Sequence, residues 1–88
     1  MLSRNKVFAV GDYVLQDYQR FAPLRLILGP SESSEYAWAH DPELGIIRVH
    51  TWSHTLVEPA TAESRSEAER IATSEEFREC VERQRKMI

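Results

Sequence analysis

The sequence has one cysteine, and it has no long apolar run. Small secreted domains normally rely on several disulfides, and Cys80 alone cannot form an internal one, so we expect a reducing compartment, the cytoplasm. No apolar region suited to a signal peptide follows the charged start. No stretch approaches the roughly 20 apolar residues that cross a bilayer. We therefore expect neither a signal peptide nor a membrane segment.

Charge of one sign is not concentrated anywhere in the chain. The net charge is -3, with five cations against seven anions before residue 61 and six against seven from there on. Nucleic-acid affinity rests largely on clustered lysine and arginine, which neutralise phosphates. The even mixture therefore disfavours a dedicated nucleic-acid-binding protein.

Recognisable catalytic and metal-binding motifs are also missing. The chain has no G-x-S-x-G, no P-loop, no G-x-G-x-x-G and no H-E-x-x-H. Cys80 lies between Phe77 and Val81 on an apolar helical stripe, which favours an inert, buried thiol. His50 and His54 on one strand would lie about 13 Å apart, too far to share a metal ion. We predict no enzymatic activity, no catalytic residue, no metal site and no cofactor.

What is present is the composition of one ordinary globular domain. The chain has 88 residues, of which 42% are hydrophobic and 28% are charged. These values are far from the low hydrophobicity and high charge of disordered chains. We expect residues 1–88 to form a single domain that folds alone or as a small homo-oligomer.

The first two thirds of the chain carry strand signals. Four segments are rich in β-formers or alternate between apolar and polar residues: 7–15, 24–28, 36–40 and 46–55. The last two flank Asp41-Pro42-Glu43-Leu44-Gly45, which suits a five-residue hairpin loop. Gly11 interrupts the first segment and indicates either a bulge or a tight turn.

One short segment resembles a known family. In Val10-Gly11-Asp12-Tyr13-Val14, a glycine and an acidic residue precede a hydrophobic strand. This five-residue pattern resembles the first strand of SH3-like barrels, and it implies a five-stranded barrel as one candidate fold.

The C-terminal third has helical composition, without glycine or proline after Pro59. Its apolar residues form two stripes on roughly opposite faces, so one straight helix would bury only one of them. Thr73 and Glu76 have the spacing of a capping box. We therefore predict a first helix over about residues 65–72, which Ser64 could open, a break at Thr73, and a second helix to about Lys86.

Together these signals predict an α+β fold. An antiparallel sheet of about four strands over residues 7–55 carries a two-part C-terminal helical segment, residues 65–87, on one face. The alternative is an SH3-like barrel of five strands followed by a helix.

The most informative feature is the aromatic and basic face of this sheet. If Ala37, Ala39, Ile47 and Val49 form the floor beneath the helices, the opposite face looks outward. That face carries Tyr36, Trp38, Arg48, His50, Trp52 and His54. Because Trp, Tyr and Arg are enriched at binding hot spots, these six residues are the predicted protein-binding site. The pattern leaves one alternative open, in which the aromatic residues are the core.

We therefore expect a non-enzymatic protein-binding module, a small inhibitor or accessory subunit that engages another protein. Small, acidic chains without motifs and with few cysteines are also typical of phage-encoded inhibitors of host or defence complexes. The alternative is an RNA- or single-stranded-DNA-binding domain, since a sheet with stacked aromatic rings and arginine is also a platform for nucleic acid.

Overall fold

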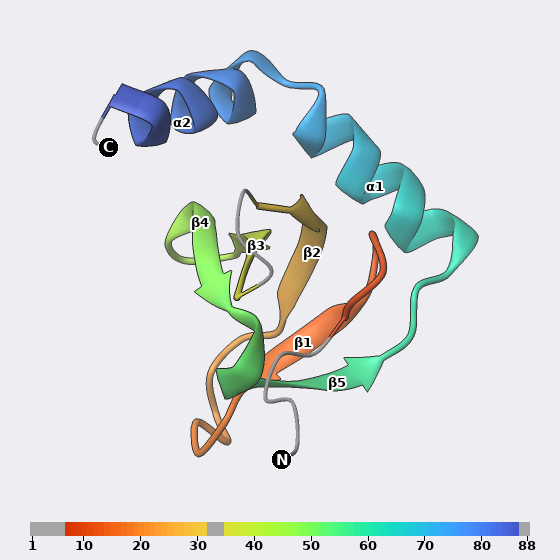
Figure 1. Cartoon of the computed structure of the whole chain (residues 1–88). Helices are drawn as coiled ribbons and strands as arrows, with labels where there is room; N and C mark the ends of the chain where they lie inside the picture. Colours follow the sequence, from red (N-terminus) through yellow and green to blue (C-terminus); the bar gives the residue numbers. More distant parts are fainter. Residues whose placement is uncertain (1–6, 32–34, 87–88) are drawn as a thin grey trace.

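The computed structural model describes residues 7–31 and 35–86. The fold is α+β, with one antiparallel sheet and two helices, as the sequence predicts (Figure 1). The elements are β1 Tyr13–Gln16, β2 Arg25–Pro30, β3 Tyr36–Asp41, β4 Gly45–His50, the 3-10 helix η1 Thr51–Ser53, β5 His54–Glu58, α1 Ala62–Ala72 and α2 Glu75–Lys86. The strands lie in the order β4-β3-β2-β1-β5, so the chain meanders from β1 to β4 and then places β5 beside β1.

The sheet has five strands where about four were expected, because the predicted strand over residues 46–55 is two strands separated by η1. Two hydrogen bonds stabilise this turn: the Thr51 N–H donates to the Glu35 carbonyl at 2.9 Å, and the Ser53 hydroxyl donates to the His50 carbonyl at 3.2 Å. Five is also the strand count of the barrel alternative. Among the described residues β4 and β5 do not pair, so the sheet keeps two edges.

The hairpin between β3 and β4 is confirmed. Asp41 pairs with Gly45 across its base, and Gly45 has a φ of +83°, in the region that favours glycine. The Asp41 carboxylate accepts hydrogen bonds from the N–H groups of Glu43 and Leu44 at 2.7 and 3.0 Å. One side chain therefore satisfies the backbone of the turn.

Val10 and Gly11 are the central residues of a tight turn before β1, and Asp12, which closes this turn, ties it to the start of α1. Gly11 has a φ of +98°, and the Asp12 N–H donates to the Ala9 carbonyl at 3.0 Å. The buried Asp12 carboxylate accepts from the N–H groups of Ala9 and Ala60, each at 2.8 Å. The glycine and acidic residue of the predicted barrel-like segment therefore have a structural role here.

The sheet is curled (Figure 1), and the residues on one of its faces pack against one another. The strand residues on this inner face are small or β-branched and form a cluster to which no helix contributes: Val14, Ile27, Ala37, Ala39 and Val49, with Phe8 and Ile47 packed against it. Small side chains on the inner face allow the facing parts of the sheet to come close together, which permits strong curvature.

The helices cover the other face of the sheet, which overturns the predicted packing. Leu26, Leu28 and Trp38 form a second core cluster with Ala68 and Ile71 of α1. Phe77, Cys80 and Val81 of α2 also pack against it. We expected the helices to lie on the alanine floor. The curled sheet buries that floor by itself, and the helices instead cover the larger side chains of the opposite face.

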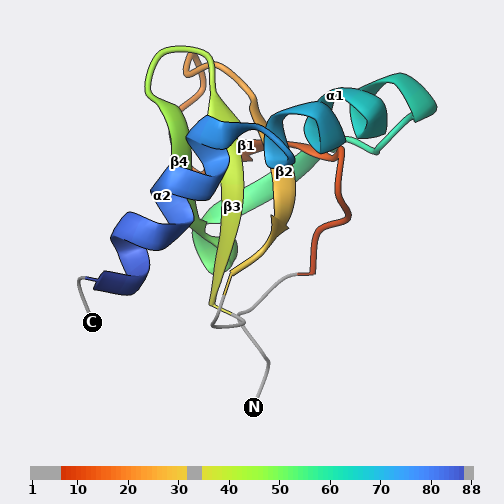
Figure 2. The ribbon, with the colours of Figure 1, turned by 90° about the horizontal axis from the view of Figure 1, so that it is seen from above.

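The predicted break between the helices is confirmed, and Figure 2 shows the two helices meeting at an angle. Both predicted caps are displaced, however. Thr61, not Ser64, opens α1 in a capping box in which Ser64 occupies the third helical position. Ser74, not Thr73, accepts from the Phe77 N–H at 3.2 Å, whereas the Thr73 hydroxyl donates back to the Glu69 and Arg70 carbonyls.

The last residue of the predicted helical segment, residue 87, lies outside the described residues. Neither α1 nor α2 combines the length with the apolar character that a membrane-spanning helix requires.

Candidate functional site

Four of the six predicted site residues gather at one end of β4. Tyr36 begins β3, Arg48 and His50 belong to β4, and Trp52 is the middle residue of η1. Tyr36 pairs directly with His50, so the side chains of these two strands meet on the same face. We call Tyr36, Arg48, His50 and Trp52 the cation–aromatic row.

Ring contacts connect the members of the row in a continuous series, with the neighbouring rings tilted relative to each other. The Arg48 guanidinium carbon lies 4.6 Å from the centroid of the Tyr36 ring, a cation–π distance. The His50 ring lies 4.6 Å from the Tyr36 ring and 5.0 Å from the Trp52 ring, centroid to centroid. Trp52 is 46% exposed. A large aromatic side chain is thus held in position while much of its surface faces solvent.

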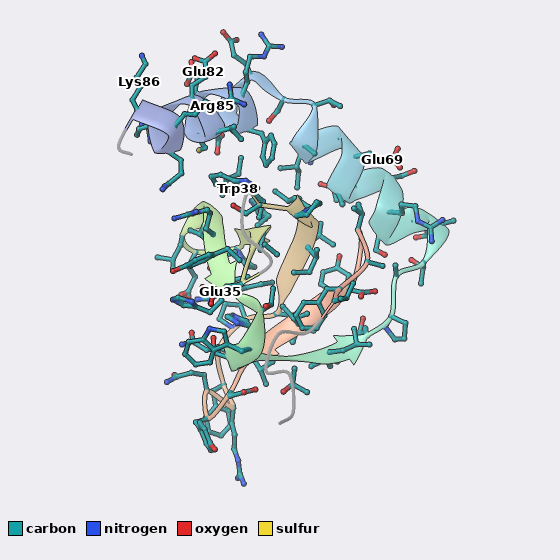
Figure 3. The ribbon with its side chains drawn as sticks, viewed as in Figure 1. Glu35, Trp38, Glu69, Glu82, Arg85 and Lys86 are labelled. Carbon is teal, nitrogen blue, oxygen red and sulfur yellow. The ribbon has the colours of Figure 1, made fainter. Side chains whose placement is uncertain are left out.

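Trp38 was predicted to look outward, and this is wrong. Its side chain is 8% exposed, and its ring meets the Phe77 ring edge-on at a centroid distance of 5.5 Å. Figure 3 shows Trp38 directed at α2, whereas Glu82 and Lys86 of that helix project away from the sheet. Trp38 therefore belongs to the core, as the alternative interpretation of the aromatic face proposed.

His54 is also buried rather than outward-facing, with 2% exposure. The prediction assumed an unbroken strand, and η1 turns the chain between His50 and His54. The His54 Nδ1 lies 2.8 Å from the His50 carbonyl, which can only accept, so Nδ1 carries the proton. The Nε2 atom then accepts from the Arg25 guanidinium at 2.9 Å. Burial lowers the pKa of His54 below its ordinary value, and this tautomer is neutral.

Arg25 links His54 to Asp41 in a buried polar network that the sequence analysis missed. The Arg25 Nε donates to Asp41 Oδ2 at 2.9 Å, and Asp41 is 3% exposed. Burial acts to raise the pKa of Asp41, but the hydrogen bonds from Arg25 and two backbone N–H groups outweigh it and leave the pKa lowered. The sequence pattern could have predicted this network. Arg25 alternates with Leu24 and Leu26, so strand periodicity places its charge on the opposite face from these leucines, the inner face. A buried charge there needs a partner of opposite charge.

A second feature that the sequence analysis missed is the loop between β1 and β2. Tyr18 and Phe21 are almost fully exposed there, and Leu44 at the hairpin tip faces the same groove of about 720 Å³. Tyr18 has a φ of +66°, which is rare for a bulky residue. This groove shares no lining residue with the row, although its loop adjoins η1, where the Asp17 N–H donates to the Ser53 carbonyl at 2.8 Å.

A smaller groove, of about 240 Å³, lies between α2 and β4. Its apolar lining residues are Trp38, Ile46, Ile47 and Cys80, and its polar ones are Arg48, Arg83 and Gln84. Arg48 also belongs to the row, so the row and this α2–β4 groove form one continuous surface. Arg83 adds a second cation to it, which strand periodicity alone did not suggest.

Metal-binding and nucleophilic chemistry find little support in the geometry. In the described part of the chain, no group of three or more histidine, cysteine or acidic residues could hold a metal ion. Cys80 is half-buried against the Trp38 cluster. Within the same residues, every buried side-chain nitrogen and oxygen has a hydrogen-bond partner.

No protein-family model, curated protein or solved structure matches this chain.

Proposed function

We propose that this chain is a non-enzymatic protein-binding module, a small inhibitor or accessory subunit that engages its partner through the cation–aromatic row. The observation that carries the proposal is the half-exposed Trp52, held against His50 at the end of the Arg48–Tyr36 stack. Rigid, partly exposed aromatic and arginine side chains lose little entropy on binding and dominate protein interfaces. The row therefore has the composition and the order of a binding hot spot.

The proposal predicts opposite outcomes for the same substitution at the two tryptophans. Trp52→Ala should leave the melting temperature almost unchanged and weaken partner binding by about 2 kcal/mol or more. Trp38→Ala should cost about 3 to 5 kcal/mol of folding stability, because it empties the core beneath α2. Thermal melts measure the stability effects, and affinity capture from cells that contain the protein, followed by mass spectrometry, finds the partner.

Phe21→Ala is the matched binding control, because Phe21 is exposed and lines a groove that shares no lining residue with the row. It should leave capture of the partner intact. The row is the wrong surface if Trp52→Ala captures the partner as well as the unaltered protein does. The assignment of the two tryptophans is wrong if Trp52→Ala unfolds at a lower temperature than Trp38→Ala.

A specific observation also favours a second candidate, single-stranded nucleic-acid binding. Arg48, Tyr36, His50 and Trp52 form a run of π-faces and positive charge on which bases could stack. The net charge of -3 weighs against it, since phosphate contacts supply most of such affinity. Tight, salt-sensitive mobility shifts with oligonucleotides at low salt would favour this candidate over the protein-binding module.

A further inference from the structure

The edge of β4 is the part of the sheet closest to the row. β4 is the first strand in the spatial order and, among the described strands, it pairs with β3 alone. Edge strands present unpaired N–H and C=O groups to which another extended segment can add. The side chains that alternate along one face of β4 are Ile46, Arg48 and His50, and their cross-strand partners are His40, Trp38 and Tyr36.

The hydrogen-bond phase of the hairpin shows which backbone groups face this edge. Antiparallel pairs alternate between hydrogen-bonded and non-hydrogen-bonded. The Thr51 N–H donates to the Glu35 carbonyl, and the β3–β4 register continues without a shift. Val49 and Ile47 therefore direct their backbone groups to β3, and Arg48 and Ile46 direct theirs to the open edge. Ile46 and Arg48, whose backbone groups pair with no other described strand, also place their side chains on the face of the row.

The surface beside this edge is cationic and apolar. Arg48 and Arg83 both line the α2–β4 groove, and Ile46 and Cys80 supply apolar surface between them. Farther along the edge, the His50 carbonyl already accepts from the His54 ring and the Ser53 hydroxyl. The accessible length of the edge therefore centres on Ile46 and Arg48. An incoming strand would place alternate side chains next to Arg48 and Ile46.

We propose that the partner contributes an extended segment, rich in acidic residues, that adds as a further strand to the open edge of β4. This inference rests on the proposed protein-binding function and names the chemistry of the partner. Backbone hydrogen bonds to Ile46 and Arg48 supply the pairing, and carboxylates opposite Arg48 and Arg83 supply the charge complementarity. Trp52 packs against the end of the added strand.

A second copy of this chain fits the same edge less well. Self-pairing centred on Arg48 would place two guanidinium groups directly opposite each other, and like charges in that position destabilise a sheet. An acidic segment from another protein meets no repulsion from Arg48.

The edge geometry can be tested by amide hydrogen exchange measured by NMR on the free protein. The N–H groups of Ile46 and Arg48 should exchange quickly, and those of Ile47 and Val49 should be protected by their bonds to β3. Equal protection at Ile46 and Ile47 would show that the edge is already covered. Protection of Ile46 that rises with protein concentration would show that the edge pairs with a second copy, and either result overturns the proposal.

The partner chemistry can be tested with short synthetic peptides that alternate valine with glutamate or valine with lysine. The glutamate peptide should bind at least about tenfold more tightly than the lysine peptide and should protect the amides of Ile46 and Arg48. Arg48→Glu should reverse this preference. Arg20→Glu makes the same change in charge at the groove of the β1–β2 loop, which shares no lining residue with the row, and should not alter the preference. Equal binding of the two peptides overturns the acidic specificity.

Strand addition itself can be tested without altering the protein. Two glutamate peptides are N-methylated on alternate amides, in opposite phases. Because only one edge of the added strand faces β4, methylation in one phase should abolish binding and methylation in the other should preserve it. Equal effects of the two phases would exclude strand addition. Displacement of the unmethylated peptide by a single-stranded oligonucleotide would assign the surface to nucleic acid and overturn the proposal.

The inference and the proposed function can fail separately. If a partner requires Trp52 but the glutamate peptide does not bind, strand addition is wrong and the protein-binding module stands. If the partner binds equally well to Trp52→Ala, the proposed function itself is wrong.

Discussion

At the scale of single residues, Gly11 is held by two independent constraints. Its φ of +98° is a conformation that other residues adopt only with strain. A Cβ atom added there would lie 3.0 Å from the backbone of Arg65 and 3.1 Å from the Ala60 side chain. The turn before β1 therefore packs directly against the first turn of α1, and a side chain at this position would require the neighbouring atoms to give way.

Gly11→Ala should destabilise the protein by roughly 1 to 3 kcal/mol, because it combines backbone strain with a backbone contact that cannot move freely. Gly45→Ala should cost less, since its φ is also positive but a Cβ there meets nothing within 4 Å. Gly29→Ala, with neither constraint, is the control. Denaturant unfolding of the three variants measures the order. A Gly45 variant less stable than the Gly11 variant would show that the contact with α1 contributes nothing.

At the scale of secondary-structure elements, the junction between α1 and α2 depends on Ser74. Its hydroxyl donates to the Ile71 carbonyl, at the end of α1, at 2.6 Å. The same oxygen accepts from the Phe77 N–H at the start of α2. Phe77 in turn packs against Trp38, so the cap places the aromatic residue through which α2 contacts the core.

Ser74→Ala should therefore cost about 1 kcal/mol, the usual value for losing a helix N-cap, and Thr73→Ala should cost less. The Thr73 hydroxyl is exposed and bonds only to carbonyls of the last turn of α1. Thermal melts of the two variants compare them directly. A larger loss for Thr73→Ala would return the cap to the position that the sequence pattern suggested.

At the scale of the whole molecule, the network of Asp41, Arg25 and His54 joins three strands. Asp41 ends β3, Arg25 begins β2 and His54 begins β5, the strand that returns to β1. Both ionisable ends of the network have lowered pKa values. The free energy of unfolding should consequently depend on pH, because protonation of Asp41 or His54 would weaken the network that joins the strands of the curled sheet.

For His54, the folded state resists protonation while the unfolded state binds a proton below about pH 6.5. The contribution of His54 to the free energy of unfolding is therefore fully present above that pH. It is lost as the pH falls, by up to about 1.4 kcal/mol per pH unit. The contribution of Asp41 is lost in turn below about pH 4. Melting temperatures should fall from pH 7 to 5 in the unaltered protein and more gradually in His54→Gln. Parallel pH profiles would show that His54 does not carry the effect.

The sequence by itself determined the α+β class, the β3–β4 hairpin and the break between two helices. These features depend on neighbouring residues: the five-residue loop with its positive-φ glycine, the change of composition after Pro59, and two apolar stripes on opposite faces of one helical segment. Local chemistry is sufficient for each of them because turn conformations and helical periodicity act over a few residues.

Only the tertiary structure decided which sheet face is covered and which aromatic residues remain exposed. Strand alternation correctly grouped Tyr36, Trp38, Arg48 and His50 on one face. It could not show that the opposite face would be buried by the curling of the sheet, nor that α2 would cover Trp38 and leave Trp52 exposed. Those outcomes depend on contacts between residues far apart in the sequence, and a side-chain pattern along one strand carries no information about what packs against it.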